Sequence, residues 1–264
     1  MRRHPFFASP RPLVFAHRGG SALAPENTIA AFDNGVALGA DGLELDVHLS
    51  RDGVVVVHHD RTLERTTTLH GPIAARTAEE LRRADVPALA DVLARYRDPR
   101  IIIEMKVNSA ELAAATIDVV RQADAVDRVC LGSFGLRVLR AARAIEPAIA
   151  TSGSREDVRW ALYRSWCRWP VSRVAYAGYQ IPEWAGRTRV VSPRFVEYAH
   201  DAGLGVQVWT VDTEEDARRL LAWGVDALIT DRPDVLVPLV RNGQSDAGIR
   251  GVRLQPDPQA PITS

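Results

Sequence analysis

Lysine is the scarcest charged residue in this chain. Lys106 is the only lysine, and arginine supplies the rest of the 33 basic residues. A coding bias toward arginine explains most of this pattern. Against that bias, a lone lysine in the run Glu104-Met105-Lys106 indicates a position that needs a compact point charge rather than a planar guanidinium.

Other features are also scarce, and each absence argues against a class of protein. The two cysteines, Cys130 and Cys167, are spaced neither as a disulfide scaffold nor as a metal-binding pair. No apolar run reaches the roughly 20 residues that span a bilayer, and the charged start lacks the apolar segment of a signal peptide. The formal net charge of +0 argues against a nucleic-acid partner. Composition therefore favours a cytoplasmic protein without stable membrane insertion.

Short apolar strands alternate with amphipathic helices along most of the chain. The hydrophobic spacing predicts strands at 13–16, 42–49, 54–57, 100–106, 128–131, 148–151, 174–180, 206–211 and 227–230. Helices are predicted at 25–38, 78–83, 88–96, 109–123, 136–145, 156–166, 193–202, 214–223 and 233–240. About eight strand-then-helix units in roughly 230 residues match a (β/α)₈ TIM barrel. A doubly wound open sheet is the alternative, but it usually has a glycine-rich phosphate loop where this chain has His17-Arg18-Gly19-Gly20.

The same pattern divides the chain into three parts. Residues 1–12 form an N-terminal extension, and residues 13–242 form the single barrel domain. Residues 243–264 lack periodicity and are rich in proline, glycine and polar residues, which predicts a flexible C-terminal tail.

Acidic and histidine side chains gather where predicted strands end. The apolar runs 13–16 and 54–57 each lead directly into histidine, at His17 and at His58-His59. Glu44 and Asp46 alternate along one strand, so their carboxylates share a face. Glu104 ends a later strand. In a barrel, the carboxyl ends of the strands form the catalytic rim, so we expect these side chains to meet there.

The combination points to a chemistry. Glu44, Asp46 and Glu104 supply three hard oxygen ligands, which suit Ca²⁺ or Mg²⁺. Histidines near neutral pKa suit proton transfer at both ends of a displacement. Arg18 and Lys106 add positive charge for an anionic group. The set favours metal-assisted phosphoryl ester chemistry.

The motifs, in order and at their spacings, resemble the glycerophosphodiester phosphodiesterase family from Leu13 to about Val240. The matching segments are His17-Arg18-Gly19, Pro25-Glu26-Asn27-Thr28, Phe32, Gly39-Ala40-Asp41, Glu44-Leu45-Asp46-Val47, Asp52-Gly53, His59-Asp60, Leu63, Arg65-Thr66-Thr67, Glu104-Met105-Lys106 and Trp209-Thr210-Val211. The resemblance implies a barrel enzyme that hydrolyses glycerophosphodiesters to sn-glycerol 3-phosphate and an alcohol with one divalent cation, Ca²⁺ or Mg²⁺, with Mn²⁺ as a further candidate. The resemblance leaves the oligomeric state open, with a homo-oligomer as one alternative.

The resemblance also implies roles for individual residues. His17 and His59 are the implied acid–base pair, and His58 should point to the opposite strand face. Glu44, Asp46 and Glu104 are the implied metal ligands, with Arg18 and Lys106 at the phosphate. Attack by water directly and attack through a cyclic phosphate both remain open.

Two further positions are expected to bind substrate. A strand-end indole at Trp209 offers a flat apolar surface for a glycerol face, although tryptophan is more often a core residue. Gln180, at another strand end, is a weaker candidate. Lys106 has the alternative of a structural pairing with Glu104. In residues 155–173 arginines and tryptophans interleave, and we expect a solvated helix face with packed aromatics rather than a membrane surface.

Two departures from the family bear on specificity. The family usually inserts a small subdomain between its His-Asp motif and its Glu-x-Lys strand, and here the interval from Asp60 to Ile103 is short. Asp212 stands where asparagine often follows Trp-Thr-Val. A shortened insertion favours a second reading, a lysophospholipase D that accepts a lipid with its acyl chain attached. A third is a non-catalytic phosphodiester-binding protein.

Overall fold

Eight parallel strands form the wall of a barrel. The computed structural model describes residues 3–170 and 174–249. The strands are β1 (Leu13–His17), β2 (Gly42–Leu49), β4 (Arg100–Met105), β5 (Val129–Gly132), β6 (Ala150–Thr151), β7 (Gly178–Pro182), β10 (Gly205–Trp209) and β11 (Ala227–Thr230). They pair in chain order, β11 pairs with β1, and one parallel bridge from Ser152 to Gly178 joins β6 to β7. This arrangement confirms the predicted (β/α)₈ barrel rather than an open sheet.

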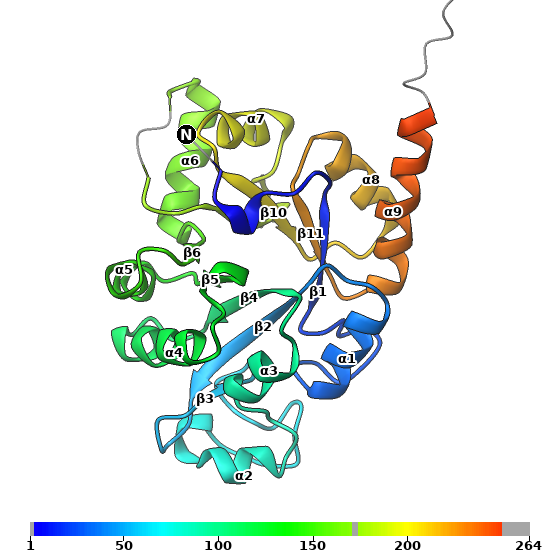
Figure 1. Cartoon of the computed structure of the whole chain (residues 1–264). Helices are drawn as coiled ribbons and strands as arrows, with labels where there is room; N and C mark the ends of the chain where they lie inside the picture. The colour runs from blue at the N-terminus through cyan, green and yellow to red at the C-terminus, as the bar shows by residue number, and fades with distance from the viewer. Residues whose placement is uncertain (1–2, 171–173, 250–264) are drawn as a thin grey trace, which may run out of the picture.

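Helices cover the outside of the barrel, as Figure 1 shows. They are α1 (Ile29–Ala37), α3 (Leu89–Arg95), α4 (Ala110–Gln122), α5 (Leu136–Ile145), α6 (Arg155–Cys167), α7 (Pro193–Asp201), α8 (Glu214–Ala222) and α9 (Pro233–Ile249). Several begin where a serine or threonine hydroxyl accepts a backbone N–H of the first turn, for example Ser109 before α4 and Ser154 before α6.

The short interval after β2 forms a small appendage. β3 (Val55–Val57) pairs antiparallel with β2 through the Asp52-Gly53 turn, and a 3₁₀ turn (Ile73–Ala75) and α2 (Ala78–Arg82) follow. At the lower end of Figure 1 this appendage lies beside the barrel. Five of its buried apolar side chains form a cluster of their own, so the segment is compact although it is short.

The first residues of the chain belong to the barrel floor. Phe6 and Phe7, in a 3₁₀ turn (Pro5–Phe7), are 0% and 2% exposed and pack with interior side chains of β1, β4 and β11. Phe7 lies so close to the neighbouring backbone that a Cβ added at Gly178 or Gly205 would come within 2.6 or 2.3 Å of its ring. The predicted N-terminal extension therefore contributes to the core. A Phe-Phe pair beside a proline has no hydrophobic period that could have indicated this burial.

Several boundaries differ from those predicted, most of them by one or two residues. Pro25–Thr28 is a turn rather than helix, because Asn27 has φ +59°, and α1 begins at Ile29 with Thr28 as its cap. The strand predicted at 174–180 lies at Gly178–Pro182, and residues 171–173 are outside the described residues. An unpredicted hairpin follows, β8 (Trp184–Ala185) and β9 (Thr188–Arg189), with Gly186 at positive φ in its turn.

The last helix is longer than expected. α9 continues to Ile249 instead of ending at Val240, so the predicted tail 243–264 begins as helix. An interior glycine such as Gly243 costs a helix only about 1 kcal/mol, which is why it need not end one. Residues 250–264 lie outside the described residues.

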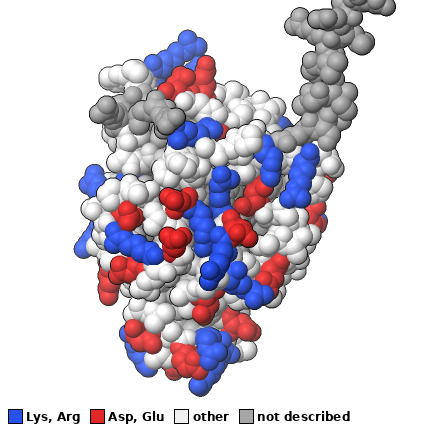
Figure 2. Space-filling view, in the orientation of Figure 1, with Lys and Arg blue, Asp and Glu red and all other residues white. Residues whose placement is uncertain are grey.

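Surface charge is mixed in sign. Figure 2 shows basic and acidic side chains side by side on the face in view. Among the described residues, no helix combines the length and apolarity needed to cross a bilayer.

Candidate active site

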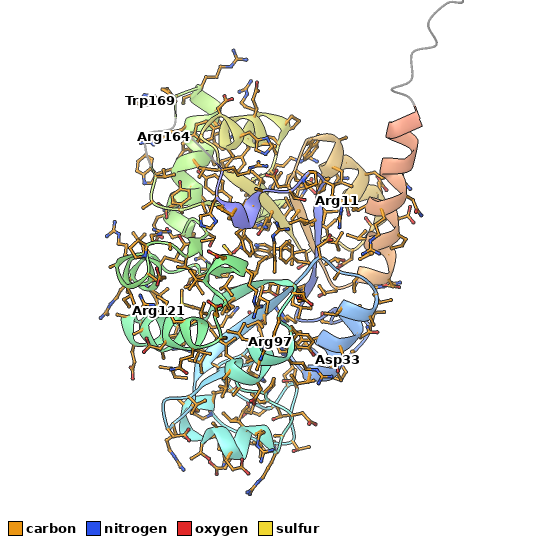
Figure 3. The ribbon with its side chains drawn as sticks, in the orientation of Figure 1. Arg11, Asp33, Arg97, Arg121, Arg164 and Trp169 are labelled. Atoms are coloured by element: carbon orange, nitrogen blue, oxygen red, sulfur yellow. The ribbon has the colours of Figure 1, made fainter. Side chains whose placement is uncertain are left out.

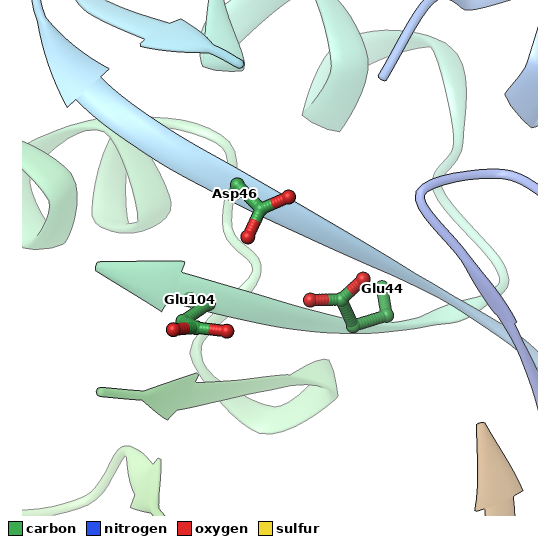
Figure 4. A group of neighbouring side chains, drawn as sticks. All are labelled: Glu44, Asp46 and Glu104. Atoms are coloured by element: carbon green, nitrogen blue, oxygen red, sulfur yellow. The ribbon is translucent and has the colours of Figure 1, made fainter. Parts of the chain in front are cut away.

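Three carboxylates meet on two neighbouring strands, at the level where β1 ends in His17. Glu44 and Asp46 alternate on β2, and Asp46 lies opposite Glu104 of β4 in the parallel register. One oxygen from each of the three lies within 4.8 Å of the others. Figure 4 shows the carboxylates turned toward a common space between the two strands. The predicted ligand set is therefore assembled by strand pairing alone.

The electrostatics of this cluster favour a cation. Glu44 and Asp46 are 5% and 1% exposed. Burial, followed by repulsion from Asp46, raises the pKa of Glu44 to about 8. Burial also raises the pKa of Glu104. A divalent cation between three such oxygens would remove the repulsion, and hard oxygen donors are the ligands that Ca²⁺ and Mg²⁺ prefer. The residues present fit such an ion.

Two basic side chains already compensate part of the negative charge. Lys106 Nζ lies 3.3 Å from Asp46 Oδ1 and 3.2 Å from Glu104 Oε1. Arg18 Nε lies 3.4 Å from Asp46 Oδ2, and Arg18 Nη1 donates to Glu26. Burial raises the pKa of Asp46, but Lys106 and Arg18 outweigh it, so that pKa is lowered. Lys106 thus forms the ion pair with Glu104 that was predicted as its alternative, structural role. Its side chain also faces the cavity described below.

His17 is held in place by a carboxylate from the far end of the chain. It ends β1, and its Nδ1 lies 2.7 Å from Asp231 Oδ1 just after β11. Ser21 donates to the same Asp231 oxygen, and Asp212 accepts from the Asp231 backbone N–H. Nε2 of His17 lies 3.8 Å from Glu44 Oε2. Burial lowers the pKa of His17, but Glu44 and Asp231 raise it more, so the net shift is upward.

His59 has a matching arrangement. Its Nδ1 lies 2.6 Å from Asp60 Oδ1, and Arg65 Nε donates to the other Asp60 oxygen. The carbonyl of His59 lies 3.1 Å from Nε2 of the buried His48, which fixes the backbone. In both His17 and His59 a carboxylate occupies Nδ1, which leaves Nε2 to exchange protons with a ligand. His58 is turned elsewhere, with Nε2 3.2 Å from the Thr62 carbonyl.

A cavity of about 760 Å³ opens over this cluster. Eight of the nine predicted site residues line it: His17, Arg18, Glu44, His59, Glu104, Lys106, Gln180 and Trp209. Asp46, the ninth, lies beneath the surface. The indole of Trp209 packs edge-on against Phe134, with ring centroids 6.0 Å apart, and forms part of the wall. Gln180 Nε2 donates to Gln207 Oε1 on the neighbouring strand β10, so its amide is partly committed to the interior.

Sequence reasoning missed the residues that orient the others. Asp231 and Asp60 hold the two histidines, and Asn27 Nδ2 donates to Asp46 Oδ2 at 2.9 Å. Glu26 accepts hydrogen bonds from both Arg18 and Arg65. Because Arg65 also binds Asp60, Glu26 connects Arg18 with the partner of His59. A carboxylate directly after the last strand was a signal for Asp231, and Glu26 and Asn27 lay inside a recognised motif. The partner of Asp231 lies 214 residues away, so local spacing could not assign this residue.

Comparison with known proteins identifies the family. The profile described as "Glycerophosphoryl diester phosphodiesterase family" matches residues 17–235. A glycerophosphodiester phosphodiesterase from Caldanaerobacter subterraneus subsp. tengcongensis is 32% identical over 251 residues, covering 88% of this chain and 99% of that protein. The probable glycerophosphodiester phosphodiesterase 2 of Mycobacterium tuberculosis is 33% identical and covers 89% of this chain and 93% of its own.

Solved structures agree with the sequence relatives. A phosphodiesterase from Oleispira antarctica, in complex with the product sn-glycerol-3-phosphate, superposes with a TM-score of 0.72 at 28% identity, over 88% of this chain and 97% of its own. A glycerophosphodiester phosphodiesterase from Agrobacterium tumefaciens gives 0.69 at 30% identity, over 84% and 97%. With the profile, the relatives and the barrel in agreement, the chain belongs to the glycerophosphoryl diester phosphodiesterase family.

Proposed function

We propose that this protein hydrolyses glycerophosphodiesters to sn-glycerol 3-phosphate and an alcohol. The observation that carries the proposal is the site itself: two histidines, each oriented by a carboxylate at Nδ1, share one cavity with a cluster of three carboxylates. Membership of the family supports the activity, and the Oleispira relative, described with that product bound, supports the product. No step of this reaction calls for nucleic acid or membrane insertion.

Glu44, Asp46 and Glu104 would hold one divalent cation, Ca²⁺ or Mg²⁺, with Mn²⁺ as a further candidate. When bound, the cation would polarise a phosphoryl oxygen and neutralise the charge that develops on it. Lys106 and Arg18 border the same space and would bind the remaining phosphate oxygens. Their positive charge acts on a phosphodiester anion whichever alcohol it carries.

His17 and His59 would divide the proton transfers. One Nε2 accepts the proton of the attacking hydroxyl, and the other donates a proton to the oxygen of the leaving alcohol. Asp231 and Asp60 keep Nδ1 protonated and hold the rings, so each histidine works through the same nitrogen throughout. Trp209 and, less directly, Gln180 would contact the glycerol end from the cavity wall.

The test is a rate panel across glycerophosphocholine, glycerophosphoethanolamine and glycerophosphoglycerol, each with Ca²⁺, Mg²⁺, Mn²⁺ or EDTA. Release of glycerol 3-phosphate should require a cation and should fall by about 10²–10⁴-fold in His17→Ala or His59→Ala, the usual loss for a general acid or base. His70→Ala is the matched control, because His70 is exposed and lies outside the cavity.

Two outcomes would overturn the proposal. Activity that survives both histidine substitutions would remove the acid–base assignment. Tight cation binding with no turnover across a broad phosphodiester panel would favour the third reading, a non-catalytic phosphodiester-binding protein.

A further inference from the structure

A row of large aromatic side chains runs along α6 and the residues directly after it. Trp160, Tyr163, Trp166 and Trp169 follow one another at intervals of three residues, and their exposed fractions are 65%, 49%, 47% and 68%. Figure 3 places Trp169 at the outer end of the helix. The packed aromatics expected from the sequence are therefore largely unpacked. We call these four residues the aromatic ridge.

The ridge is a continuous surface. The Trp160 and Tyr163 rings meet edge-on with centroids 6.4 Å apart, and the Tyr163 and Trp166 rings meet edge-on at 5.6 Å. Tyr163 and Trp166 also line the cavity, whereas Trp160 and Trp169 are not among the residues that line it. A contiguous exposed aromatic surface of this kind marks a site of interaction with a partner.

Positive charge accompanies the aromatic ridge. Residues 158–182 contain four arginines and no aspartate or glutamate, although the chain has 33 acidic residues. Of these arginines, Arg159 and Arg168 are exposed on α6 and at its carboxyl end. Arg194 of α7 is exposed too, and its Nη1 donates to the Trp166 carbonyl at 3.5 Å. The charge beside the ridge therefore favours an anionic partner.

Acidic side chains lie at the margin of this surface. On α6 they are Glu156 and Asp157, both in the first turn, and Asp157 accepts from the capping Ser154 hydroxyl. On α7 they are Glu197 and Asp201. In a two-fold dimer the same patch of both copies meets itself, so arginines of one ridge would face arginines of the other. This repulsion disfavours a second copy of the chain as the occupant.

We propose that the aromatic ridge binds reversibly to the surface of a membrane that contains anionic lipids. Tryptophan and tyrosine rings prefer the interfacial layer of a bilayer, because the ring is apolar and its N–H or O–H stays hydrated. Arginines beside them bind the lipid phosphates. A row of projecting rings enters a deformable lipid layer directly, whereas a folded protein partner would need a complementary groove. Such adsorption differs from the stable insertion that the sequence argued against.

The experiment measures binding of the full chain to unilamellar vesicles of phosphatidylcholine, with and without phosphatidylglycerol, by cosedimentation. EDTA is present so that no divalent cation bridges protein and lipid. Binding should require phosphatidylglycerol and weaken with added salt, because each basic side chain near an anionic surface adds about fivefold in affinity and salt screens this attraction. Brominated acyl chains in the vesicles should quench tryptophan fluorescence, since the indoles enter the lipid layer.

Variants locate the contact. Trp160→Ala and Trp169→Ala should each lower the partition coefficient about tenfold, because each removes a large apolar side chain from the interface. Arg168→Asn should lower it about fivefold, and asparagine tolerates the φ of +52° found at this position. None of the three lines the cavity, so hydrolysis of dissolved glycerophosphocholine should be unchanged. Trp184→Ala is the matched control, because Trp184 is 50% exposed on the β8–β9 hairpin with the Arg189 guanidinium 4.8 Å from its ring.

Four outcomes would overturn the proposal. The first is no vesicle binding, or binding that does not depend on phosphatidylglycerol. The second is an equal loss in Trp184→Ala, which would show that any exposed indole suffices. The third is equal affinity for polyglutamate, which would show recognition of charge alone, as in an acidic protein. The fourth is a lipid-free dimer that Trp160→Ala dissociates, which would identify a second copy as the occupant. Turnover of glycerophosphocholine without vesicles tests the proposed function separately.

Discussion

Glu44 should destabilise the protein without a divalent cation and stabilise it with one. One oxygen of its carboxylate lies within 4.8 Å of a carboxylate oxygen of Asp46 and of Glu104. Two unit charges at that separation repel by at least about 3.5 kcal/mol at an effective dielectric constant of about 20. Lys106 offsets part of this repulsion, and glutamine can still accept the Arg18 backbone N–H that Glu44 accepts at 3.1 Å. We therefore expect Glu44→Gln in EDTA to raise the free energy of unfolding by about 1–2 kcal/mol.

The cation should reverse the ranking of the two proteins. At about 100 times its dissociation constant, a ligand that binds only the folded state adds about 2.7 kcal/mol. For a chain of this size that corresponds to a rise in Tm of roughly 5–10 °C. Glu44→Gln removes one of three charged ligands, so most of this rise should disappear. The variant should thus melt above the unaltered protein in EDTA and below it in saturating Ca²⁺ or Mg²⁺.

Thermal unfolding followed by circular dichroism, in EDTA and in stepwise excess of each cation at one pH, measures both effects. Glu197→Gln, on the exposed face of α7, is the matched control and should leave both Tm values and their difference unchanged. The reasoning is refuted if Glu44→Gln lowers Tm in EDTA, or if it keeps the full cation-dependent rise. A cation with no effect on the unaltered protein would refute the assignment of the cluster.

Three further predictions test the groups around the site and the floor. Asp231→Asn should lower kcat by about 10²–10⁴-fold with Tm nearly unchanged, because His17 loses the partner that fixes its tautomer; an unchanged kcat would show that the 2.7 Å contact has no role in turnover. Lys106→Arg should lower kcat/KM at least about tenfold although the charge is kept, since a planar fork cannot bridge Asp46 and Glu104 as a point charge does; full activity would contradict the inference from the lone lysine. Phe7→Ala should lower the free energy of unfolding in urea by about 3–5 kcal/mol, and a loss below 1 kcal/mol would mean that the N-terminal turn is not part of the core.

The reactive residues near the strand ends could be predicted from local sequence, because parallel strands end on the same edge of a sheet. Glu44 and Asp46 share a face by the two-residue period of a strand, and Glu104 ends an apolar run as buried parallel strands do. The barrel rule then places all three with His17 on one rim. Their gathering within 4.8 Å agrees with that reasoning.

Other features had no local signature. The hairpin at β8–β9 is too short for periodicity, and the turn at Asn27 looked like the first turn of a helix because proline and glutamate commonly begin one. The exposed aromatics of α6 were expected to be packed. Whether an aromatic side chain on a helix is covered depends on the neighbouring element, and here Tyr163 and Trp166 stay about half exposed.

The sequence by itself determined the alternation of strands and helices, the rim on which the reactive groups lie, and the family. Only the tertiary structure decided what orients those groups. Asp231 reaches His17 across 214 residues because β11 pairs with β1 when the barrel closes. Phe6 and Phe7 form the floor of the barrel because its strands close around them. The interior of a barrel exists only once all its strands are in place. Hydrophobic period reports which face of a segment is buried, but not which distant segment will cover it.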